Sequence, residues 1–419
     1  METGGVIELF LALGVIIAGA QVSGAAARRL GQPRVFGELL AGVILGPTLL
    51  NMLHWGTFTD PDALYHTIQE LAEIGVLFLM FSVGLEVHLH ELLSVGRVAV
   101  LGGLFGAVLP LALALVAVLP FGYDMETAIF VGVVLAATSV SISAQTLLEL
   151  GLLSTKEGIG LLAAAVADDV LAILILSVVI AVLGGEGGGS AGEIVWILVR
   201  MMLYIAGALA VAWFVLPRVF EWIDRHQELT ASVPAFALVT ALVFGWSAEA
   251  LGGVATITGS FIAGLGLSQT TERTKDEIVD AVRRVSYSFL VPIFFVSVGL
   301  QTDLGAIEGR LLPLAGVLLI AAVVSKVVGS GIGAYLGGFN SGEALRLGVC
   351  MISRGEVGLI VASLGLSSGL LSEEIFQPVF LVILLTTVLT PPLVRYVFRG
   401  ATTELSIAPP IEQVQSHSD

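Results

Sequence analysis

The sequence predicts an all-α polytopic membrane protein, and three observations lead to this fold class. Hydrophobic residues make up 56% of the 419 residues and charged residues only 12%. The mean hydropathy of +0.99 lies far from that of a soluble domain. The apolar residues gather in runs of roughly 20, the length that crosses a bilayer as a helix. Ionisable residues inside such runs are rare, and in a membrane they indicate functional sites.

Thirteen apolar runs follow one another along the chain. We place the spans at 5–27, 35–52, 67–87, 97–120, 126–148, 157–183, 193–217, 230–250, 253–270, 282–300, 311–337, 345–370 and 374–394. The division at Gly252-Gly253 is the least distinct, and a merged run would give twelve spans. With thirteen spans and the N-terminus outside, only Arg200 and Arg310 among the loop cations lie outside. The positive-inside rule therefore favours thirteen spans and a cytoplasmic C-terminus.

Composition also argues against several other functions. The single Cys350 provides no disulfide framework, and the six histidines lie in predicted loops, near helix ends or in the tail. A net charge of −16 without a basic stripe does not suit nucleic acid. No glycine-rich phosphate loop occurs, so we expect no nucleotide, and no cofactor. The N-terminal run lacks a basic leader, and we interpret it as a retained helix.

An internal repeat relates the two halves of the chain. Three motifs recur seven spans later: G-E-L-L-A-G at 37–42 and G-S-F-I-A-G at 259–264, F-S-V-G-L at 81–85 and V-S-V-G-L at 296–300, and stretches from G-V to G-L-L-S at 132–154 and 348–372. An odd offset inverts the second copy, an architecture typical of secondary transporters. We expect inverted six-helix repeats at 1–192 and 221–400, a linker helix at 193–220 and a disordered tail at 401–419.

Two adjacent carboxylates, Asp168 and Asp169, lie in a run that is otherwise uncharged from 159 to 183. Neighbouring residues on a helix point about 100° apart, so the two can take different roles. A purely structural pair is the alternative. Lys326 lies deep in span 11, where a lysine either seeks a carboxylate or extends to an interface. We expect it to neutralise one of the two aspartates.

Spans 5 and 12 contain residues that favour broken helices. Span 5 holds several short hydroxyl side chains, including Thr138 and Ser139, which compete for backbone hydrogen bonds or mediate helix packing. A break frees carbonyls that can bind a small cation. In span 12, Arg354 and Glu356 either cancel the dipoles of two half-helices or form a plain buried ion pair. Glu73 in span 3 is deep enough to pair with Arg354.

At these residues the chain resembles the bacterial sodium/proton antiporters of the monovalent cation:proton antiporter superfamily. The resemblance covers about residues 5–400. It lies in G-Q-P-R-V-F-G-E-L-L-A-G-V-I-L-G-P at 31–47, A-T-S-V-S-I-S-A at 137–144, A-D-D-V at 167–170, the span-11 lysine followed by V-V-G, and R-G-E-V-G-L-I-V-A at 354–362. It is closest to the thirteen-helix electrogenic members, which carry paired aspartates and two crossed broken helices.

The resemblance implies a role for each site residue. Asp169 would be the main cation and proton site, and Asp168 would pair with Lys326. Thr138 and Ser139 would lie beside the cation. Members with Asn-Asp at the pair are typically electroneutral, so Asp168 implies electrogenic exchange. The family also implies a homodimer and an elevator-like motion of the site-bearing core against a dimerisation domain.

We therefore expect a secondary transporter, not an enzyme, that exchanges Na⁺, or Li⁺ or K⁺, for protons across a bacterial inner membrane. A sodium-coupled solute symporter is an alternative, but it needs a polar solute pocket that the spans do not offer. An intramembrane aspartyl protease needs two aspartates that share a proton. In such proteases the two come from different helices, whereas Asp168 and Asp169 are adjacent.

Overall fold

The computed structural model describes residues 3–87, 94–183, 191–225, 233–301, 309–367 and 369–407. Within these ranges the chain is helical and forms no strand, and ten helices are long and apolar enough to cross a membrane. The predicted all-α membrane class is thus confirmed. The predicted runs 35–52, 253–270 and 345–370 form helices of only 10 to 12 residues. The number of thirteen spans therefore stays a prediction.

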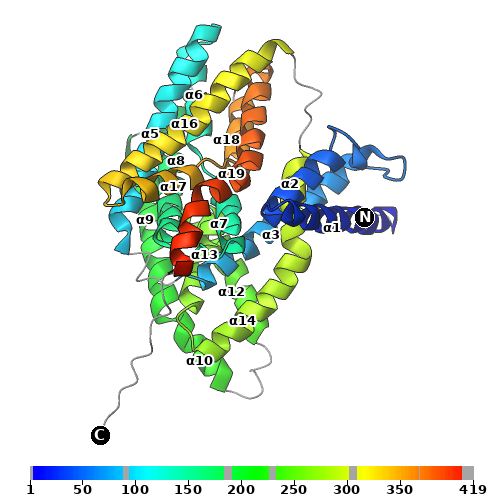
Figure 1. The fold of residues 1–419 in the computed structure, drawn as a ribbon, viewed down its shortest axis with the longest axis vertical. Coiled ribbons are helices and arrows are strands. Elements are labelled where there is room, and N and C mark those ends of the chain that lie inside the picture. Colours follow the sequence, from blue (N-terminus) through cyan, green and yellow to red (C-terminus); the bar gives the residue numbers. More distant parts are fainter. Residues whose placement is uncertain are drawn as a thin grey trace.

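The helices form two bundles, which Figure 1 shows in different parts of the molecule. In the first bundle α2 packs against α1 and α15, and α13 packs against α3 and α12. Its members are α1 (Thr3–Arg29), α2 (Arg34–Leu45), α3 (Pro61–Leu85), α12 (Val233–Ser247), α13 (Thr256–Leu267), α14 (Glu272–Val285) and α15 (Val291–Leu300).

The second bundle is centred on two long helices, α5 and α16, which pack along each other and contact most of the remaining members. These members are α5 (Gly96–Val118), α6 (Met125–Ala136), α7 (Val140–Glu149), α8 (Lys156–Leu183), α16 (Leu312–Leu336), α17 (Ser341–Cys350), α18 (Glu356–Ser367) and α19 (Glu373–Ile407). Between the bundles in the chain, α9 (Ala191–Phe214) contacts α8 and α13, and α10 (Leu216–Arg225) follows it. Helix α19 continues beyond residue 401, where we expected the tail to begin. Residues 408–419 lie outside the described residues.

Two irregular turns explain how single apolar runs are divided. A π-helical turn at Ala248–Gly252 ends at Gly253, whose φ of +65° is left-handed and suits glycine. The expected division between 250 and 253 is therefore present. A second π-helical turn, Ser286–Leu290, precedes α15. Pro292, the second residue of α15, follows this turn, and because proline has no N–H to donate, the helix cannot keep its regular hydrogen bonds there.

Two pairs of glycines bring helix backbones of the first bundle into contact. A methyl group on Gly42 of α2 would collide with the carbonyl oxygen of Val296 and lie 2.7 Å from the Cα of Gly299 on α15. A methyl group on Gly264 of α13 would collide with the carbonyl oxygen of Phe81 on α3 and lie 3.1 Å from the Cα of Gly84. Small residues allow such close approach between membrane helices. The two contacts join the same motif positions of the two halves.

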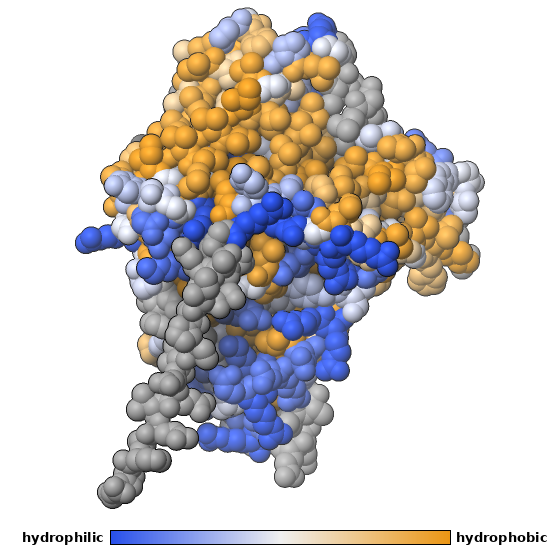
Figure 2. All heavy atoms as spheres, viewed as in Figure 1, coloured by the Kyte–Doolittle hydropathy of each residue, from blue (hydrophilic) through white to orange (hydrophobic). Residues whose placement is uncertain are grey.

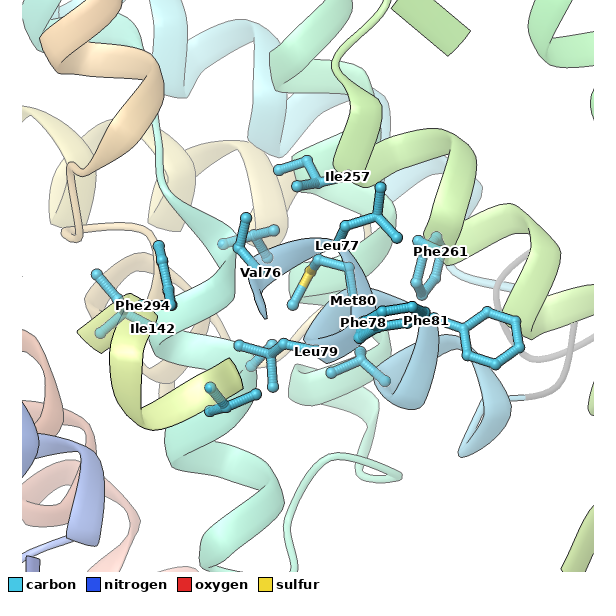
Figure 3. Packing of buried hydrophobic residues seen from close by; sticks show 14 of the residues in the cluster. Val76, Leu77, Phe78, Leu79, Met80, Phe81, Ile142, Ile257, Phe261 and Phe294 are labelled. Atoms are coloured by element: carbon cyan, nitrogen blue, oxygen red, sulfur yellow. The ribbon is translucent and has the colours of Figure 1, made fainter. Parts of the chain in front are cut away.

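The buried core and the apolar surface are both extensive. Figure 3 shows Phe78, Met80, Phe81 and Phe261 packed where α3 meets α13. Large apolar side chains are also exposed over wide parts of the surface, as Figure 2 shows for one face. Ile7 on α1, for example, is 68% exposed. A soluble protein rarely exposes so much contiguous apolar surface, whereas lipid covers it in a membrane.

Candidate functional site

Asp168 and Lys326 form a buried ion pair between α8 and α16. Lys326 Nζ lies 3.1 Å from Asp168 Oδ1 and 3.4 Å from Oδ2, and the two side chains are 0% and 1% exposed. The charges of Asp169 and Arg354 also act on Lys326. A buried ammonium of this kind is retained only beside a carboxylate. The structure thus joins the lysine to the first of the two aspartates.

Asp169 faces a different neighbour from Asp168. Its Oδ2 accepts a hydrogen bond of 2.8 Å from the Thr258 hydroxyl on α13. Asp169 and Thr258 also line one cavity of about 20 Å³, together with Met80, Val140 and other apolar residues. This volume is enough for about one water molecule. Sequence reasoning missed Thr258, because it is one of three hydroxyl residues in T-I-T-G-S at 256–260, and small hydroxyl residues in membrane helices usually serve helix packing.

Two broken helices meet beside these aspartates. Residues 137–139 separate α6 from α7, and residues 351–355 separate α17 from α18. The backbone N–H of Ser139 donates to the carbonyl of Ser353 over 2.9 Å, and the Ser143 hydroxyl donates to the carbonyl of Cys350. Both breaks expected from the sequence are therefore present. The backbone hydrogen bond joins the two breaks, and the Ser143 hydroxyl joins α7 to the last residue of α17.

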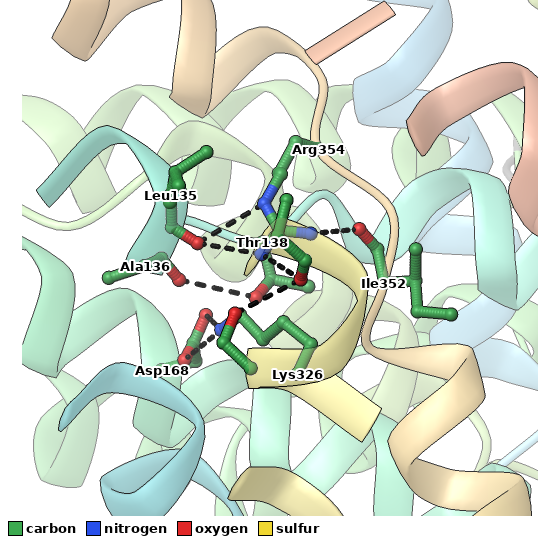
Figure 4. Close-up of polar contacts among 9 residues, drawn as sticks. Leu135, Ala136, Thr138, Asp168, Lys326, Ile352 and Arg354 are labelled. Atoms are coloured by element: carbon green, nitrogen blue, oxygen red, sulfur yellow. Dashed lines mark hydrogen bonds and ion pairs between the residues drawn. The ribbon is translucent and has the colours of Figure 1, made fainter. Parts of the chain in front are cut away.

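Arg354 fills the point where the two half-helices end. Its guanidinium is fully buried and donates to the carbonyls of Leu135 (2.9 Å and 3.1 Å), Ala322 (2.9 Å) and Ile352 (2.5 Å). Leu135 lies in the last turn of α6 and Ile352 lies two residues beyond the end of α17, and unpaired carbonyls at such helix ends concentrate negative charge. Figure 4 shows Arg354 directed at these carbonyls. Arg354 thus contacts carbonyls beside both helix ends, the geometry that compensation of the two helix dipoles would need.

Glu356 and Glu73 were the two carboxylates expected near the point where the broken helices cross. Glu356 is the first residue of α18, where a negative charge suits the helix dipole, but its side chain lies outside the described residues. The expected pairing of Glu73 with Arg354 is wrong. Glu73 is exposed on α3 near Glu70 and Glu249, whereas the guanidinium of Arg354 is directed at backbone carbonyls. Carbonyls at a broken helix can replace a carboxylate as the arginine's partner.

Thr138 and Ser139 lie inside the break of span 5. Both side chains are buried. The Thr138 hydroxyl is 3.5 Å from the carbonyl of Ala136, at the long limit for a hydrogen bond. Ser139 Oγ lies 3.0 Å from Ser141 Oγ. Val140, the next residue, lines the cavity that Asp169 also lines. The start of α7, directly after the break, therefore lines the same cavity as Asp169.

A second polar contact between the bundles lies at the far end of α7. The carboxylate of Glu149 accepts hydrogen bonds from the backbone N–H groups of Arg34 (2.5 Å) and Val35 (3.3 Å). These are the first residues of α2, whose own N-cap position is a proline without a capping side chain. Gln145 donates to Glu149 and accepts from the Tyr287 hydroxyl. A carboxylate at a helix N-terminus satisfies free N–H groups and suits the helix dipole.

The site contains no preassembled metal centre. No group of three or more histidine, cysteine, aspartate or glutamate side chains that could hold a metal ion occurs in the described ranges. Two carboxylates, one ammonium and a set of hydroxyl and carbonyl oxygens remain. Such groups suit the brief binding of a hard monovalent cation and of protons.

Comparison with known proteins gives the same assignment along almost the whole chain. Residues 12–399 match the family model described as sodium/hydrogen exchanger, transmembrane. The Na⁺/H⁺-K⁺ antiporter GerN of Bacillus cereus is 34% identical over 93% of this chain and 96% of that protein. The Na⁺/H⁺ antiporter of Enterococcus hirae is 34% identical over 94% of this chain and 98% of that protein.

A solved structure supports the fold independently of sequence. The sodium proton antiporter MjNhaP1 of Methanocaldococcus jannaschii superposes with a TM-score of 0.71 over 99% of both chains, at 17% identity. At that identity the likeness concerns the fold alone. Together with the family model and the relatives, it leads to one assignment: this chain belongs to the transmembrane sodium/hydrogen exchanger family and is a cation/proton antiporter, not an enzyme.

Proposed function

We propose that the protein exchanges Na⁺ for protons electrogenically, with Asp169 as the shared binding group. The observation that carries this proposal is that the two aspartates have different surroundings. Asp168 is neutralised by Lys326 at 3.1 Å, whereas Asp169 lies beside a small cavity next to a broken helix. A carboxylate placed in this way can take up either a cation or a proton, so the two ions compete for it.

The cation site combines Asp169 with oxygens of the broken span. Thr138 and Ser139 contribute hydroxyl and backbone oxygens, because residues 137–139 are not held in a helix. Asp168 adds negative charge next to the site. Oxygen ligands of this type suit a hard cation such as Na⁺, and Li⁺ or K⁺ compete according to their size. Arg354 and Glu356 keep the crossing intact by compensating the helix ends.

Electrogenic exchange requires a second proton. A cation and a proton on Asp169 carry equal charge, so exchange at Asp169 alone is electroneutral. If sodium binding draws Asp168 away from Lys326, the freed ammonium can release a proton, and the pair takes it up again when sodium leaves. Two protons then exchange for one cation. The coupled groups, not one residue, set the pH at which exchange is fastest.

Alternating access follows from sliding of the second bundle against the first, as an elevator. The second bundle carries Asp168, Asp169 and Lys326, and the first bundle remains as a scaffold. The inverted repeats at 1–192 and 221–400 support this model, because such repeats exchange their conformations between the two states. The equivalent glycine contacts at Gly42 and Gly264 favour the repeat.

The protein would lie in a bacterial inner membrane as a homodimer, with thirteen spans, the N-terminus outside and the C-terminus in the cytoplasm. The positive-inside distribution supports this orientation. The exposed apolar side chains of α1 offer a surface for a second copy or for lipid. Cross-linking of single cysteines placed on α1 in native membranes would test the dimer.

Ion fluxes in proteoliposomes test the exchange itself. Sodium, lithium or potassium is added to vesicles with an imposed pH gradient. Only the cation that the protein transports should dissipate the gradient, because protons cross the membrane in exchange for it. Wild type and Asp169→Asn are compared with the membrane potential clamped and free. Proton flux that follows the potential and vanishes in the variant would support electrogenic exchange at Asp169. Proton flux that is independent of the membrane potential would contradict the two-proton cycle. Absence of cation-evoked proton flux in folded protein would refute the exchange.

A further inference from the structure

The Thr258 hydroxyl joins the proposed ion-binding carboxylate to the other bundle. Thr258 belongs to α13, which packs against α3 and α12 of the first bundle, whereas Asp169 belongs to α8, which packs against α5, α6, α7 and α17 of the second. The hydroxyl donates to Asp169 Oδ2 over 2.8 Å, and both side chains are buried. The hydrogen bond therefore crosses the surface along which the two bundles would slide.

The strength of this hydrogen bond depends on what Asp169 carries. A bare carboxylate is a charged acceptor, and hydrogen bonds to charged groups are about twice as strong as neutral ones. A proton on Asp169 turns the bond into a neutral one. A bound cation draws the carboxylate oxygens toward itself and weakens their interaction with the hydroxyl. The contact between the bundles is thus strongest when Asp169 is empty.

An exchanger needs this property. Tight coupling requires that the site change sides only when it holds a cation or a proton, since an empty site that moves turns exchange into a leak. We propose that Thr258 is a positioning residue that latches the empty Asp169 to the first bundle and so prevents movement of the unloaded site. This inference rests on the proposed exchange of a cation for protons at Asp169.

Among the residues that the structure describes, Thr258 is the one polar residue besides Asp169 that lines this cavity. Apart from Asp169 and Thr258, its lining residues are apolar: Met80, Val140, Leu162, Ala165, Val166, Ile257 and Phe261. A bare carboxylate that moved across these side chains would lose the Thr258 hydrogen bond without gaining another from them. A loaded and neutralised carboxylate would lose much less. The apolar lining therefore increases the difference that the latch creates.

Three variants of α13 separate the latch from general packing. Thr258→Val keeps the shape and removes the hydroxyl, whereas Thr258→Ser keeps the hydroxyl and should behave as wild type. Ser260→Ala is the matched control, because the Ser260 hydroxyl is also buried on α13 but donates to the Leu77 carbonyl within the first bundle. Thr258→Ala replaces the valine variant if that variant does not fold.

The measurement is proton flux down a pH gradient in proteoliposomes that contain no alkali cation, with thiocyanate on both sides to dissipate the potential. Sodium-evoked flux is recorded on the same vesicles. We expect sodium-free flux in Thr258→Val to exceed that of wild type, Thr258→Ser and Ser260→Ala about tenfold or more, as the loss of one charge-assisted hydrogen bond implies. Sodium-evoked exchange should remain in all of them.

Equal sodium-free flux in Thr258→Val and Thr258→Ser would overturn the latch. Complete loss of sodium-evoked flux in folded Thr258→Val would also overturn it, because Thr258 would then be needed for binding instead. The failure of the proposed function has a different signature. In that case wild type itself shows no sodium-evoked proton flux, whereas failure of the latch leaves wild-type exchange intact.

Discussion

The Asp168–Lys326 ion pair permits a quantitative test by a double-mutant cycle. At a separation of 3.1 Å and an effective dielectric constant of about 20, the attraction is about 5 kcal/mol. Removal of one partner leaves the other charge buried and costs about 3–5 kcal/mol. We expect Asp168→Asn and Lys326→Gln each to lower the free energy of unfolding by about this amount. The double variant should lose far less than the sum, with a coupling energy of at least about 2 kcal/mol.

Unfolding in mixed detergent micelles, followed by tryptophan fluorescence, provides the measurement, since the chain has five tryptophans. Recovery of the folded signal must first establish that unfolding is reversible. Arg310 and Glu374 are the matched control, with a similar distance of 3.2 Å but side chains 65% and 45% exposed. Their cycle should give a coupling energy below about 0.5 kcal/mol. Additive effects at Asp168 and Lys326 would refute the reasoning about the buried pair.

Further predictions concern other contacts. Arg354→Met removes the guanidinium donor from the buried carbonyls of Leu135 and Ile352 and should cost about 3 kcal/mol of unfolding free energy; a loss below about 1 kcal/mol would contradict its role at the helix ends. Gly42→Ala and Gly264→Ala should each cost about 1–3 kcal/mol, because a methyl group collides with a facing backbone; thermal unfolding of both variants checks this. Glu149→Ala should lower stability by about 0.5–2 kcal/mol through loss of the α2 cap, and Glu149→Gln by less. Lys326→Gln should retain sodium/proton exchange but lose its response to membrane potential, and a flux that still follows an imposed potential would contradict the second-proton model.

The sequence pattern predicted the helical membrane fold and the ion pair of Lys326 with one of the two aspartates. Apolar runs separated by turn residues identify helices without any tertiary information. A lysine deep in the membrane requires a carboxylate, and the chain offers few, so the partner of Lys326 was limited to two neighbouring residues. The short hydroxyls of span 5 and the glycine beside Arg354 in span 12 favoured a break in each span, because such residues weaken a helix locally, and the structure places these breaks at 137–139 and 351–355.

The contacts that the sequence did not predict depend on how the helices approach one another in three dimensions. Arg354 was expected to find the carboxylate of Glu73, but carbonyls freed by the breaks lie closer, and their position follows only from how the helices cross. Thr258 carries no local signal, since its hydroxyl matters only because α13 packs opposite Asp169. The role of Glu149 is equally hidden, because the sequence does not show that α7 ends beside the uncapped start of α2.

The Glu149 contact also makes the two halves unequal. In the repeat, the start of α2 corresponds to the start of α13, because the motifs at Gly37 and Gly259 are equivalent, and α7 corresponds to α18. The only acidic residue of α18 is Glu356 at its first position, so its far end provides no carboxylate that could cap α13 as Glu149 caps α2. The proposed sliding motion, if it exchanges the repeat conformations, would therefore break this cap without forming an equivalent one. On that proposal the cap stabilises the present conformation relative to the opposite one, and differential ion binding would have to offset the difference.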